Sequence, residues 1–331
     1  MQQRKLGRTG LAVTRMGLGL AALGRPGYIN LDHADALNHN YEVDAMRAHT
    51  HTVLDAAWVA GIRYFDAARS YGRAEEFLAS WLVARGIAPV NATIGSKWGY
   101  TYTADWQVDA EVHEVKEHSL DVLTRQRQET HQNLGQHLDL YQVHSATLSS
   151  GIFERTEVLE ELARMRDAGL GIGLSLSGPG QPEALRRAMA IEIGGEPVFA
   201  TVQATWNLLE RSCGPVLAEA HAAGMGVLVK EAVANGRLTP ANDNPAFAEQ
   251  RALLQAVADE QGVSIDAGAL AGVLAQPWCD VVLSGAASVD HLESNVRAFD
   301  VEWDGSIDDR LAGLVEAPES YWQTRDELAW N

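Results

Sequence analysis

Eight short apolar stretches that alternate with longer amphipathic ones constrain the fold of this chain more than any other feature. Most of them hold neighbouring apolar residues rather than a strict apolar–polar alternation, which is typical of strands covered on both faces. The stretches begin near Val13, Ile62, Asn91, Leu138, Gly171, Phe199, Gly226 and Asp280. Several of the intervening segments show helical spacing and end at a glycine, which is a common helix-stop signal.

This alternation predicts a (β/α)₈ TIM barrel in the α/β class. We expect a single domain over residues 1–331, with an N-terminal cap segment and a C-terminal tail over residues 301–331. The aromatic residues of the tail indicate either a cover for the outer helices or a lid over the site. A doubly wound sheet is the rival fold, and it would need G-x-G-x-x-G directly before a helix. Here Gly17 and Gly19 are followed by Gly24, two positions too late, which favours the barrel.

The charge balance narrows the range of partners. The chain has 26 Lys+Arg against 44 Asp+Glu, a formal net charge of −18. Proteins that bind nucleic acid or anionic membranes normally carry a basic face, so we expect neither partner. The two cysteines lack the spacing of a disulfide framework or a metal site, and the N-terminus does not have the pattern of a signal peptide. We therefore expect a cytoplasmic monomer or small homo-oligomer that binds a small molecule and no metal.

Ionisable residues follow three consecutive predicted strands. Asp66 ends the second strand, with Tyr71 in the loop beyond it, and Lys97 and His144 end the third and the fourth. In a barrel of this kind, catalytic residues lie at the C-terminal ends of the strands. Each residue alone has a structural explanation, such as a strand-end aspartate that forms a turn. Because buried ionisable groups are costly unless they are paired, their joint placement favours a functional site.

These four residue types predict a general acid for a carbonyl oxygen. A lysine ammonium beside Tyr71 should lower the pKa of the phenol below its usual value of about 10. Asp66 would keep Lys97 charged and oriented, and His144 would orient a substrate oxygen. Proton transfer supplies no electrons, and no serine or cysteine is accompanied by its own base. A bound hydride donor therefore completes the chemistry best.

The chain resembles the aldo-keto reductase superfamily over nearly its whole length. The resemblance is carried by GLGL at 17–20, YFDAARSYGRAEEFL at 64–78, IGSKWG at 94–99, LDLYQVH at 138–144, IGLS at 172–175, VQATWNLLER at 202–211 and SGAASVDHLESNVRA at 284–298. It implies an NAD(P)(H)-dependent oxidoreductase that reduces aldehydes or ketones, or oxidises sugar-like alcohols. Its catalytic residues would be Tyr71, Lys97, Asp66 and His144, with Tyr71 as the general acid/base.

The resemblance also implies a nicotinamide dinucleotide that lies across the C-terminal face of the barrel without a Rossmann fold. Its contacts would be Gly19, Leu20, Asp66, Ser175, Gln203, Trp206, Lys230, Glu231, Ala232, Val233, Gly285, Ala286, Ala287, His291 and Asn295. Ser175 and Gln203 would hold the carboxamide. The chain departs from the family where KEAV, residues 230–233, replaces a segment like YSPL. Lys230 and Glu231 would face the cofactor, pair with each other or lie in solvent.

The expected cofactor is NADPH, with NADH as an alternative. Many NADPH-preferring members of the family place a lysine and an arginine where this chain has Gly285 and His291. Because Lys and Arg make the strongest bonds to a 2′-phosphate, we expect weaker discrimination against NADH than usual. The β subunits of voltage-gated potassium channels look similar here. The alternative function is therefore a non-catalytic, redox-sensing subunit that binds a nicotinamide cofactor.

Substrate contacts are expected from the loops at the rim, which vary among barrels. The candidates are His144 and the loop aromatics Tyr28 and Trp98, followed by Tyr100, Tyr102 and Trp106. These rings either stack on a sugar or an aromatic carbonyl, or pack against the wall of the barrel. Trp206 is likewise either a cofactor contact or a core aromatic. The motifs name no particular substrate.

Overall fold

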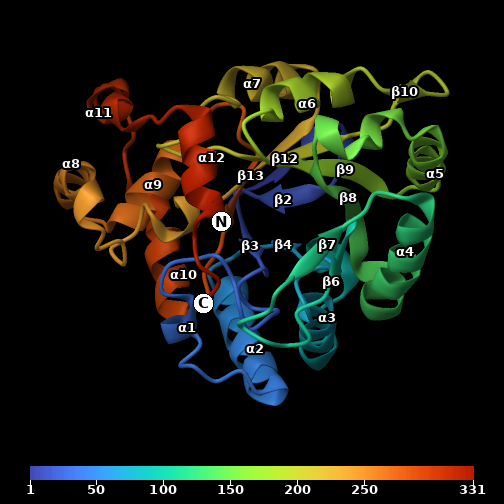
Figure 1. Cartoon of the computed structure of the whole chain (residues 1–331), viewed down its shortest axis with the longest axis horizontal. Coiled ribbons are helices and arrows are strands. Elements are labelled where there is room, and N and C mark those ends of the chain that lie inside the picture. The colour runs from blue at the N-terminus through green and yellow to red at the C-terminus, as the bar shows by residue number, and fades with distance from the viewer.

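A closed barrel of eight parallel strands forms the centre of the molecule (Figure 1). The structure is a computed structural model that describes residues 1–331. Around the barrel the strands follow the order β12, β13, β14, β3, β4, β5, β8 and β9. Their bounds are Met16–Gly19 for β3, Tyr64–Asp66 for β4, Thr93–Trp98 for β5, Leu138–Ala146 for β8, Gly171–Leu176 for β9, Thr201–Thr205 for β12, Gly226–Lys230 for β13 and Val281–Ser284 for β14. Each strand lies within one of the predicted apolar stretches, so the predicted (β/α)₈ barrel is confirmed.

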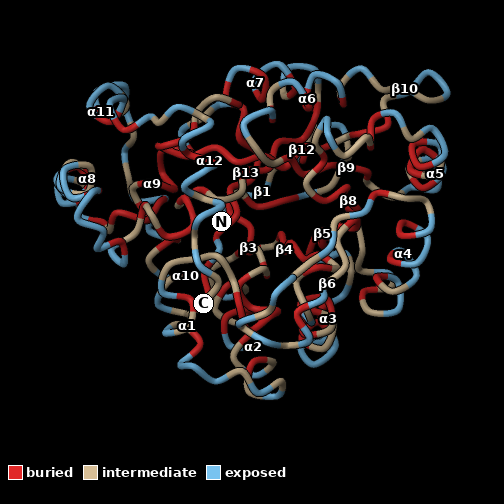
Figure 2. The backbone as a smooth tube through the Cα atoms, viewed as in Figure 1, coloured by how far each residue is buried: buried red, intermediate tan, exposed pale blue.

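Helices surround the strands, and their apolar faces cover the barrel, whose strands are buried (Figure 2). Their bounds are His33–Ala36 for α1, Val43–Val59 for α2, Ala74–Ala84 for α3, Leu120–Leu134 for α4, Thr156–Asp167 for α5, Gln181–Met189 for α6, Gly214–Ala222 for α7, Ala248–Gln261 for α8, Ile265–Leu274 for α9, Val289–Val296 for α10, Gly305–Leu311 for α11 and Pro318–Asp326 for α12. Gly61 and Gly169 follow α2 and α5 with φ of 89° and 97°, a left-handed conformation that ends a helix at little cost. None of the helices combines the length and the apolar character that crossing a membrane requires.

An N-terminal hairpin closes the end of the barrel at which the strands begin. Its strands are β1 (Gln3–Lys5) and β2 (Ala12–Thr14), which pair antiparallel. Leu6 and Val13 are fully buried in one cluster with barrel residues that include Leu228 and Val281. The predicted N-terminal cap segment is therefore this hairpin.

Two further hairpins lie outside the barrel. β6 (Tyr100–Tyr102) and β7 (Glu114–Lys116) pair antiparallel beyond the C-terminal end of β5. β10 (Glu192–Ile193) and β11 (Glu196–Pro197) pair between α6 and β12. The β6–β7 hairpin matters for function because Tyr100 and Glu114 reach the mouth of the barrel.

The C-terminal tail returns across the mouth of the barrel, where α12 lies beside β13 (Figure 1). Tyr28 and Asn331 exchange two backbone hydrogen bonds, of 3.1 and 3.2 Å. The Asn331 side chain accepts hydrogen bonds from the backbone N–H groups of His33 and Ala34, at 3.1 and 3.3 Å. The structure shows both alternatives for the tail: Ile307, Leu311 and Trp322 pack in one buried cluster with residues of α8 and α9. The end of the tail lies over the site, where Arg325 and Trp330 line the cavity.

Candidate active site

The structure brings Asp66 and Lys97 into direct contact at the C-terminal end of the barrel. Adjacent strands β4 and β5 place Asp66 beside Gly95, two residues before Lys97. The fully buried Lys97 Nζ donates to Asp66 Oδ2 and, at 2.9 Å, to the Ala67 carbonyl. The Asp66 side chain is 2 % exposed and lines the cavity, whereas Lys97 is fully buried and does not.

The second oxygen of Asp66 is held by three side chains from the barrel interior. Oδ1 accepts hydrogen bonds from the Tyr64 hydroxyl at 3.2 Å, from Gln142 Nε2 at 3.2 Å and from Gln203 Nε2 at 3.0 Å. Hydrogen bonds from three buried donors fix the orientation of a carboxylate. Asp66 is therefore held in one orientation at the base of the site.

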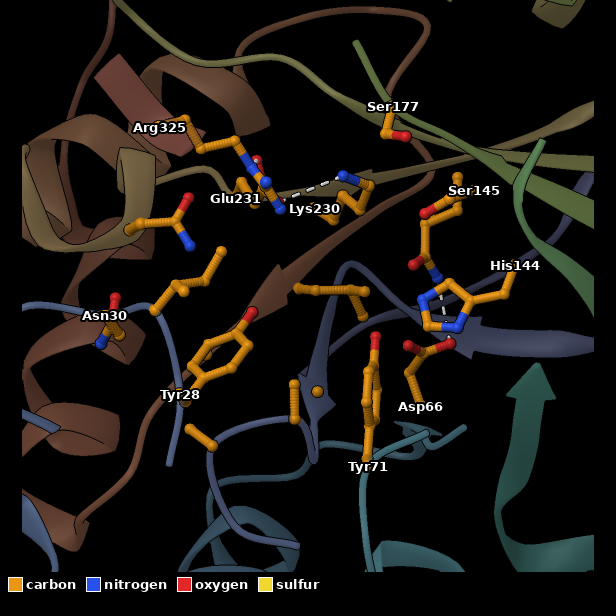
Figure 3. Close-up of a pocket in the computed structure, with 18 of the residues that line it drawn as sticks. Tyr28, Asn30, Asp66, Tyr71, His144, Ser145, Ser177, Lys230, Glu231 and Arg325 are labelled. Carbon is orange, nitrogen blue, oxygen red and sulfur yellow. Dashed lines mark hydrogen bonds and ion pairs between the residues drawn. The ribbon is translucent and has the colours of Figure 1, made fainter. Parts of the chain in front are cut away.

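Tyr71 and His144 complete the predicted cluster. Lys97 Nζ lies 4.8 Å from the centroid of the Tyr71 ring. The rings of Tyr71 and His144 meet edge to face, with centroids 5.5 Å apart, and His144 Nδ1 lies 3.3 Å from the Ser70 hydroxyl. Figure 3 shows the Tyr71 hydroxyl pointing into the cavity beside Asp66 and His144. Asp66, Tyr71 and His144 thus line one cavity of about 400 Å³, and Lys97 lies buried behind Asp66.

The pKa of Tyr71 moves in the direction opposite to the predicted one. Burial and the Asp66 carboxylate raise the pKa of the phenol well above its usual value. The predicted lowering was wrong because burial and the Asp66 carboxylate dominate the shift, and the Lys97 ammonium is itself paired with Asp66. Arg25 is the cation that lowers the pKa of Tyr71, and its effect does not outweigh burial.

The other two titratable members shift in ways that follow from burial. Burial, together with Lys97, Lys230 and Arg25, lowers the pKa of His144 well below its usual value, so its imidazole is neutral at pH 7. Burial also lowers the pKa of Lys97, an effect that Asp66 opposes. The resulting site holds a neutral phenol and a neutral imidazole above one buried ion pair.

Most of the expected cofactor and substrate residues line this cavity. The ones that do are Gly19, Tyr28, Asp66, Tyr71, His144, Gln203, Lys230, Glu231, Ala232, Val233 and Gly285. They come from the C-terminal ends of β3, β4, β8, β12, β13 and β14 or from the loops beyond them. The resemblance therefore located the correct end of each strand.

Two expected aromatic contacts lie in the core instead. Trp98 is fully buried and packs edge to face on His118, with centroids 5.7 Å apart. Trp206 is 4 % exposed and packs in the same way on Trp278, at 5.6 Å. Neither lines the cavity, and both belong to the main buried core cluster. The expectation of a substrate contact at Trp98 is corrected, and Trp206 is the core aromatic of its two alternatives.

Other expected cofactor residues support the backbone around the cavity without lining it. Ser175 Oγ accepts from the Ser145 N–H at 2.8 Å, and the Leu20 N–H donates to the Asp66 carbonyl at 2.9 Å. Asn295 is 6 % exposed and bonds to Asp266 and to Ser284, both at 2.7 Å.

The turn between β14 and α10 holds the remaining three. Ala286 N–H donates to Ser284 Oγ, the Ala287 carbonyl accepts from His49 Nε2, and His291 N–H donates to the Ser288 hydroxyl that caps α10. These three residues shape the rim of the cavity together with Ser175, Leu20 and Asn295. Direct contact of any of them with a ligand stays a prediction.

Lys230 and Glu231 pair with each other, which was one of the alternatives. Lys230 Nζ lies 3.3 Å from Glu231 Oε1 and donates to the Thr205 hydroxyl at 2.7 Å. Arg325 from α12 binds the same carboxylate with its Nη2 at 2.8 Å and its Nε at 3.1 Å. Burial raises the pKa of Glu231, but Arg325 and Lys230 outweigh it and lower that pKa to about 2. Figure 3 shows these three side chains along one wall of the cavity.

Arg25 is a site residue that sequence reasoning missed. It is 3 % exposed and donates to the Ser70 carbonyl at 3.1 Å and to Glu114 Oε2 at 3.0 Å. Its guanidinium carbon lies 5.1, 5.4 and 4.8 Å from the ring centroids of Tyr28, Tyr71 and Trp330. Tyr100, one of the expected loop aromatics, also lines the cavity. Other lining residues, which were not named individually, are Glu114, Ser145, Ser177, Arg325 and Trp330. Two features of the sequence could have pointed to these site residues: Arg25 lies in the same rim loop as Tyr28, and the tail is rich in aromatic residues.

TIM-barrel enzymes carry their active sites at the C-terminal ends of the strands, where this (β/α)₈ barrel gathers its ionisable residues. An aldo-keto reductase of Bacillus halodurans, solved in its holo form, shares the fold with a TM-score of 0.70 and 21% identity. That similarity covers 96% of this chain and 97% of the other. Residues 15–312 match the aldo/keto reductase family. The chain belongs to this family and is an oxidoreductase.

Two relatives carry more specific names. A 6-dehydroglucose reductase of Novosphingobium aromaticivorans is 25% identical over 325 residues, which cover 95% of each chain. A pyridoxal 4-dehydrogenase of Microbacterium luteolum is 34% identical over 164 residues. That match spans 43% of each chain, so this chain covers less than half of the pyridoxal enzyme.

Proposed function

We propose that the chain is an NADPH-dependent oxidoreductase that interconverts small carbonyl compounds and alcohols, with Tyr71 as the general acid/base. One observation carries this proposal. Asp66, the Tyr71 phenol and the His144 imidazole line a single cavity at the mouth of the barrel, and the buried Lys97 pairs with Asp66 behind it. Such a cluster suits proton donation to a carbonyl oxygen.

The residues around the cavity fit a nicotinamide dinucleotide. Gly285 is exposed, and a Cβ added there would meet no atom within 4 Å, so its backbone is open to a ligand. Gln203 offers a side-chain amide and Lys230 a cation, and Ala232 and Val233 line the wall beside them. When bound, the cofactor supplies or accepts a hydride at the substrate carbon.

The proposed proton chemistry follows from the protonation of the site. Burial keeps Tyr71 protonated at neutral pH, so its hydroxyl is ready to donate to a carbonyl oxygen. His144 is neutral, and Ser70 occupies its Nδ1, which leaves Nε2 to orient the substrate oxygen. After donation, the ammonium of Lys97 and the guanidinium of Arg25 are the cations that stabilise the phenolate.

The lining favours a small polar substrate. Asn30, Asn235 and Ser177 supply hydrogen-bonding groups, and Tyr28 and Tyr100 supply aromatic faces. Two relatives are named for pyridoxal and for 6-dehydroglucose, which supports an oxygen-rich aldehyde or ketone. We therefore propose hydroxylated carbonyl compounds as the substrate class.

Replacing Tyr71 by phenylalanine tests the proposed acid. We expect wild-type protein to oxidise NADPH, seen as loss of absorbance at 340 nm, in the presence of 4-nitrobenzaldehyde. Tyr71→Phe should lower kcat/KM about 10²–10⁴-fold, the usual contribution of general acid–base catalysis. Tyr41→Phe, outside the cavity, is the matched control and should change it less than twofold. An unchanged rate in Tyr71→Phe, or loss of activity in Tyr28→Phe instead, would contradict the assignment.

The same assay separates the proposal from its alternative, the non-catalytic redox-sensing subunit. A pure sensor has no evident need for four contacting ionisable residues, which is why we favour the enzyme. A wild-type protein that binds NADPH but reduces no member of an aldehyde and ketone panel would support the sensor.

Cofactor preference gives a separate prediction. Residues 284–296 hold no lysine or arginine, so a 2′-phosphate would lack its strongest partners there. We expect Kd values for NADPH and NADH that differ less than about a hundredfold, roughly 2.7 kcal/mol, by fluorescence titration. Gly285→Lys should increase the preference for NADPH. A larger ratio in the wild type would contradict the expectation.

A further inference from the structure

A second depression, separate from the main cavity, is lined entirely by polar and charged residues. It has a volume of about 330 Å³ and lies between the segment that leads from β7 into α4 and the loop that leads from β8 into α5. Its lining residues are Lys116, Glu117, His118, Thr147, Ser149, Ser150 and Arg155. Nothing in the proposed reaction uses these side chains.

The two cations of this depression have no anionic partner. Arg155 is the only arginine of the chain with neither a side-chain hydrogen bond nor an ion pair, and its Nε is buried without a partner. Lys116 makes one long hydrogen bond, of 3.3 Å, to the Thr147 hydroxyl. The one carboxylate, Glu117, is exposed and accepts from the Ser119 hydroxyl at 2.6 Å. Two unpaired cations in a chain with a net charge of −18 call for an explanation.

His118 is the third basic group and is almost completely buried. It is 3 % exposed, its Nε2 donates to the His144 carbonyl at 2.9 Å, and its Nδ1 is buried without a partner. Gly99 permits this position, because a Cβ there would collide with the imidazole. Burial, together with Lys116 and Arg155, lowers the pKa of His118 to about 4. An anion between these groups would neutralise the local positive charge and favour protonation of His118 Nδ1.

We propose that this depression binds a small tetrahedral oxyanion, either inorganic phosphate or the phosphoryl group of a small phosphate ester. Lys116, Arg155 and a protonated His118 would supply charge-assisted hydrogen bonds. The hydroxyls of Thr147 and Ser149 now bond to each other at 3.2 Å and would turn toward the ligand. The bound anion would reach the main site through one hydrogen bond, from His118 to the backbone of His144.

Isothermal titration with inorganic phosphate, at constant ionic strength and pH 7.5, tests the proposal without any activity assay. Wild-type protein should bind one phosphate saturably. Arg155→Gln and Lys116→Gln should each weaken the affinity about tenfold or more, since charged hydrogen bonds contribute at least that much. Lys5→Gln removes an exposed cation from the N-terminal hairpin and should bind like the wild type. Equal affinity in all four proteins, or no saturable binding of either inorganic phosphate or a phosphate ester, would overturn the proposal.

A second titration, with glycerol 3-phosphate, separates the two sources of the anion. Binding of the ester but not of inorganic phosphate identifies a phosphorylated metabolite, and the reverse identifies the free ion. NMR of the His118 ring nitrogens gives an independent readout: the anion should protonate Nδ1 in the wild type and leave it unprotonated in Arg155→Gln. Because the Arg155 side chain makes no hydrogen bond or ion pair within the protein, its variant should keep the wild-type circular dichroism. Phosphate that leaves the His118 nitrogens unchanged would contradict the assignment.

Discussion

The charge state of Tyr71 depends on which neighbours its ring and its hydroxyl face. Asp66 raises the pKa of the phenol and Arg25 lowers it, while burial dominates both. Glu114 holds Arg25 at 3.0 Å, so the β6–β7 hairpin influences the proposed proton donor from outside the barrel. Arg25 acts on Tyr71 from a rim loop and is not one of the four residues that the sequence predicted as catalytic.

The pH dependence of carbonyl reduction follows from these shifts. The pKa of Tyr71 is raised and that of His144 is lowered, so neither group titrates between their usual values of about 10 and about 6.5. The pKa of Lys97 is lowered, so Lys97 loses its proton before Tyr71 does. We expect kcat/KM for reduction to be flat through neutral pH and to fall at higher pH as Lys97 deprotonates. A midpoint near pH 6.5, checked by a pH–rate profile, would contradict the neutral His144.

At the scale of elements, α12 is attached to the barrel by one buried ion pair. The Arg325 side chain is 21% exposed and its partner Glu231 is 8% exposed. Glu231 stands directly after β13 with φ of 54°, a conformation that turns its carboxylate toward the tail. The helix therefore contributes both a wall of the cavity and the counter-ion of a strand-end carboxylate.

Arg325→Gln tests this attachment. The variant leaves Glu231 with Lys230 and Thr205 only, so we expect a loss of about 1–3 kcal/mol in the free energy of unfolding in urea. Arg310→Gln on α11 is the matched control, because Arg310 pairs with Glu260 at the surface, where such pairs contribute about 0–1 kcal/mol. Equal effects of the two substitutions would show that the tail is not held through Glu231.

At the scale of the whole molecule, both ends of the chain complete the barrel. Pairing of β14 with β3 joins the last barrel strand to the first, from which we infer that the chain forms one domain. The N-terminal hairpin covers the far end, where Leu6 packs on Gly226. The tail covers the near end, so the cavity opens only between rim loops.

Gly226→Ala tests the packing of the hairpin. A Cβ at Gly226 would lie 2.6 Å from Leu6 Cγ and 3.0 Å from the Leu6 backbone, so we expect a loss of about 1–3 kcal/mol in unfolding free energy. Gly268→Ala, in α9, is the control: its Cβ would meet no atom within 4 Å, and we expect a gain of about 0.5–1 kcal/mol. An unchanged unfolding free energy in Gly226→Ala would mean that the hairpin moves away from residue 226 without cost.

Local sequence alone determined the barrel and the place of its reactive groups. Strand and helix patterns depend on the spacing of apolar residues over a few positions, and each of the eight strands appeared where that spacing predicts it. The sequence also placed Asp66, Lys97 and His144 at the mouth of the barrel, because the C-terminal ends of parallel strands all lie at the same end of a barrel.

Tertiary structure decided what surrounds those groups. Arg25 and Arg325 reach the cavity from a loop and from a tail that are far apart in sequence, and no local pattern records that convergence. Trp98 and Trp206 have strand-end positions like those of true site residues, yet helix packing turns them into the core. The direction of the Tyr71 pKa shift was also undecided until burial was known, because desolvation depends on every atom packed around the phenol rather than on its neighbours in the chain.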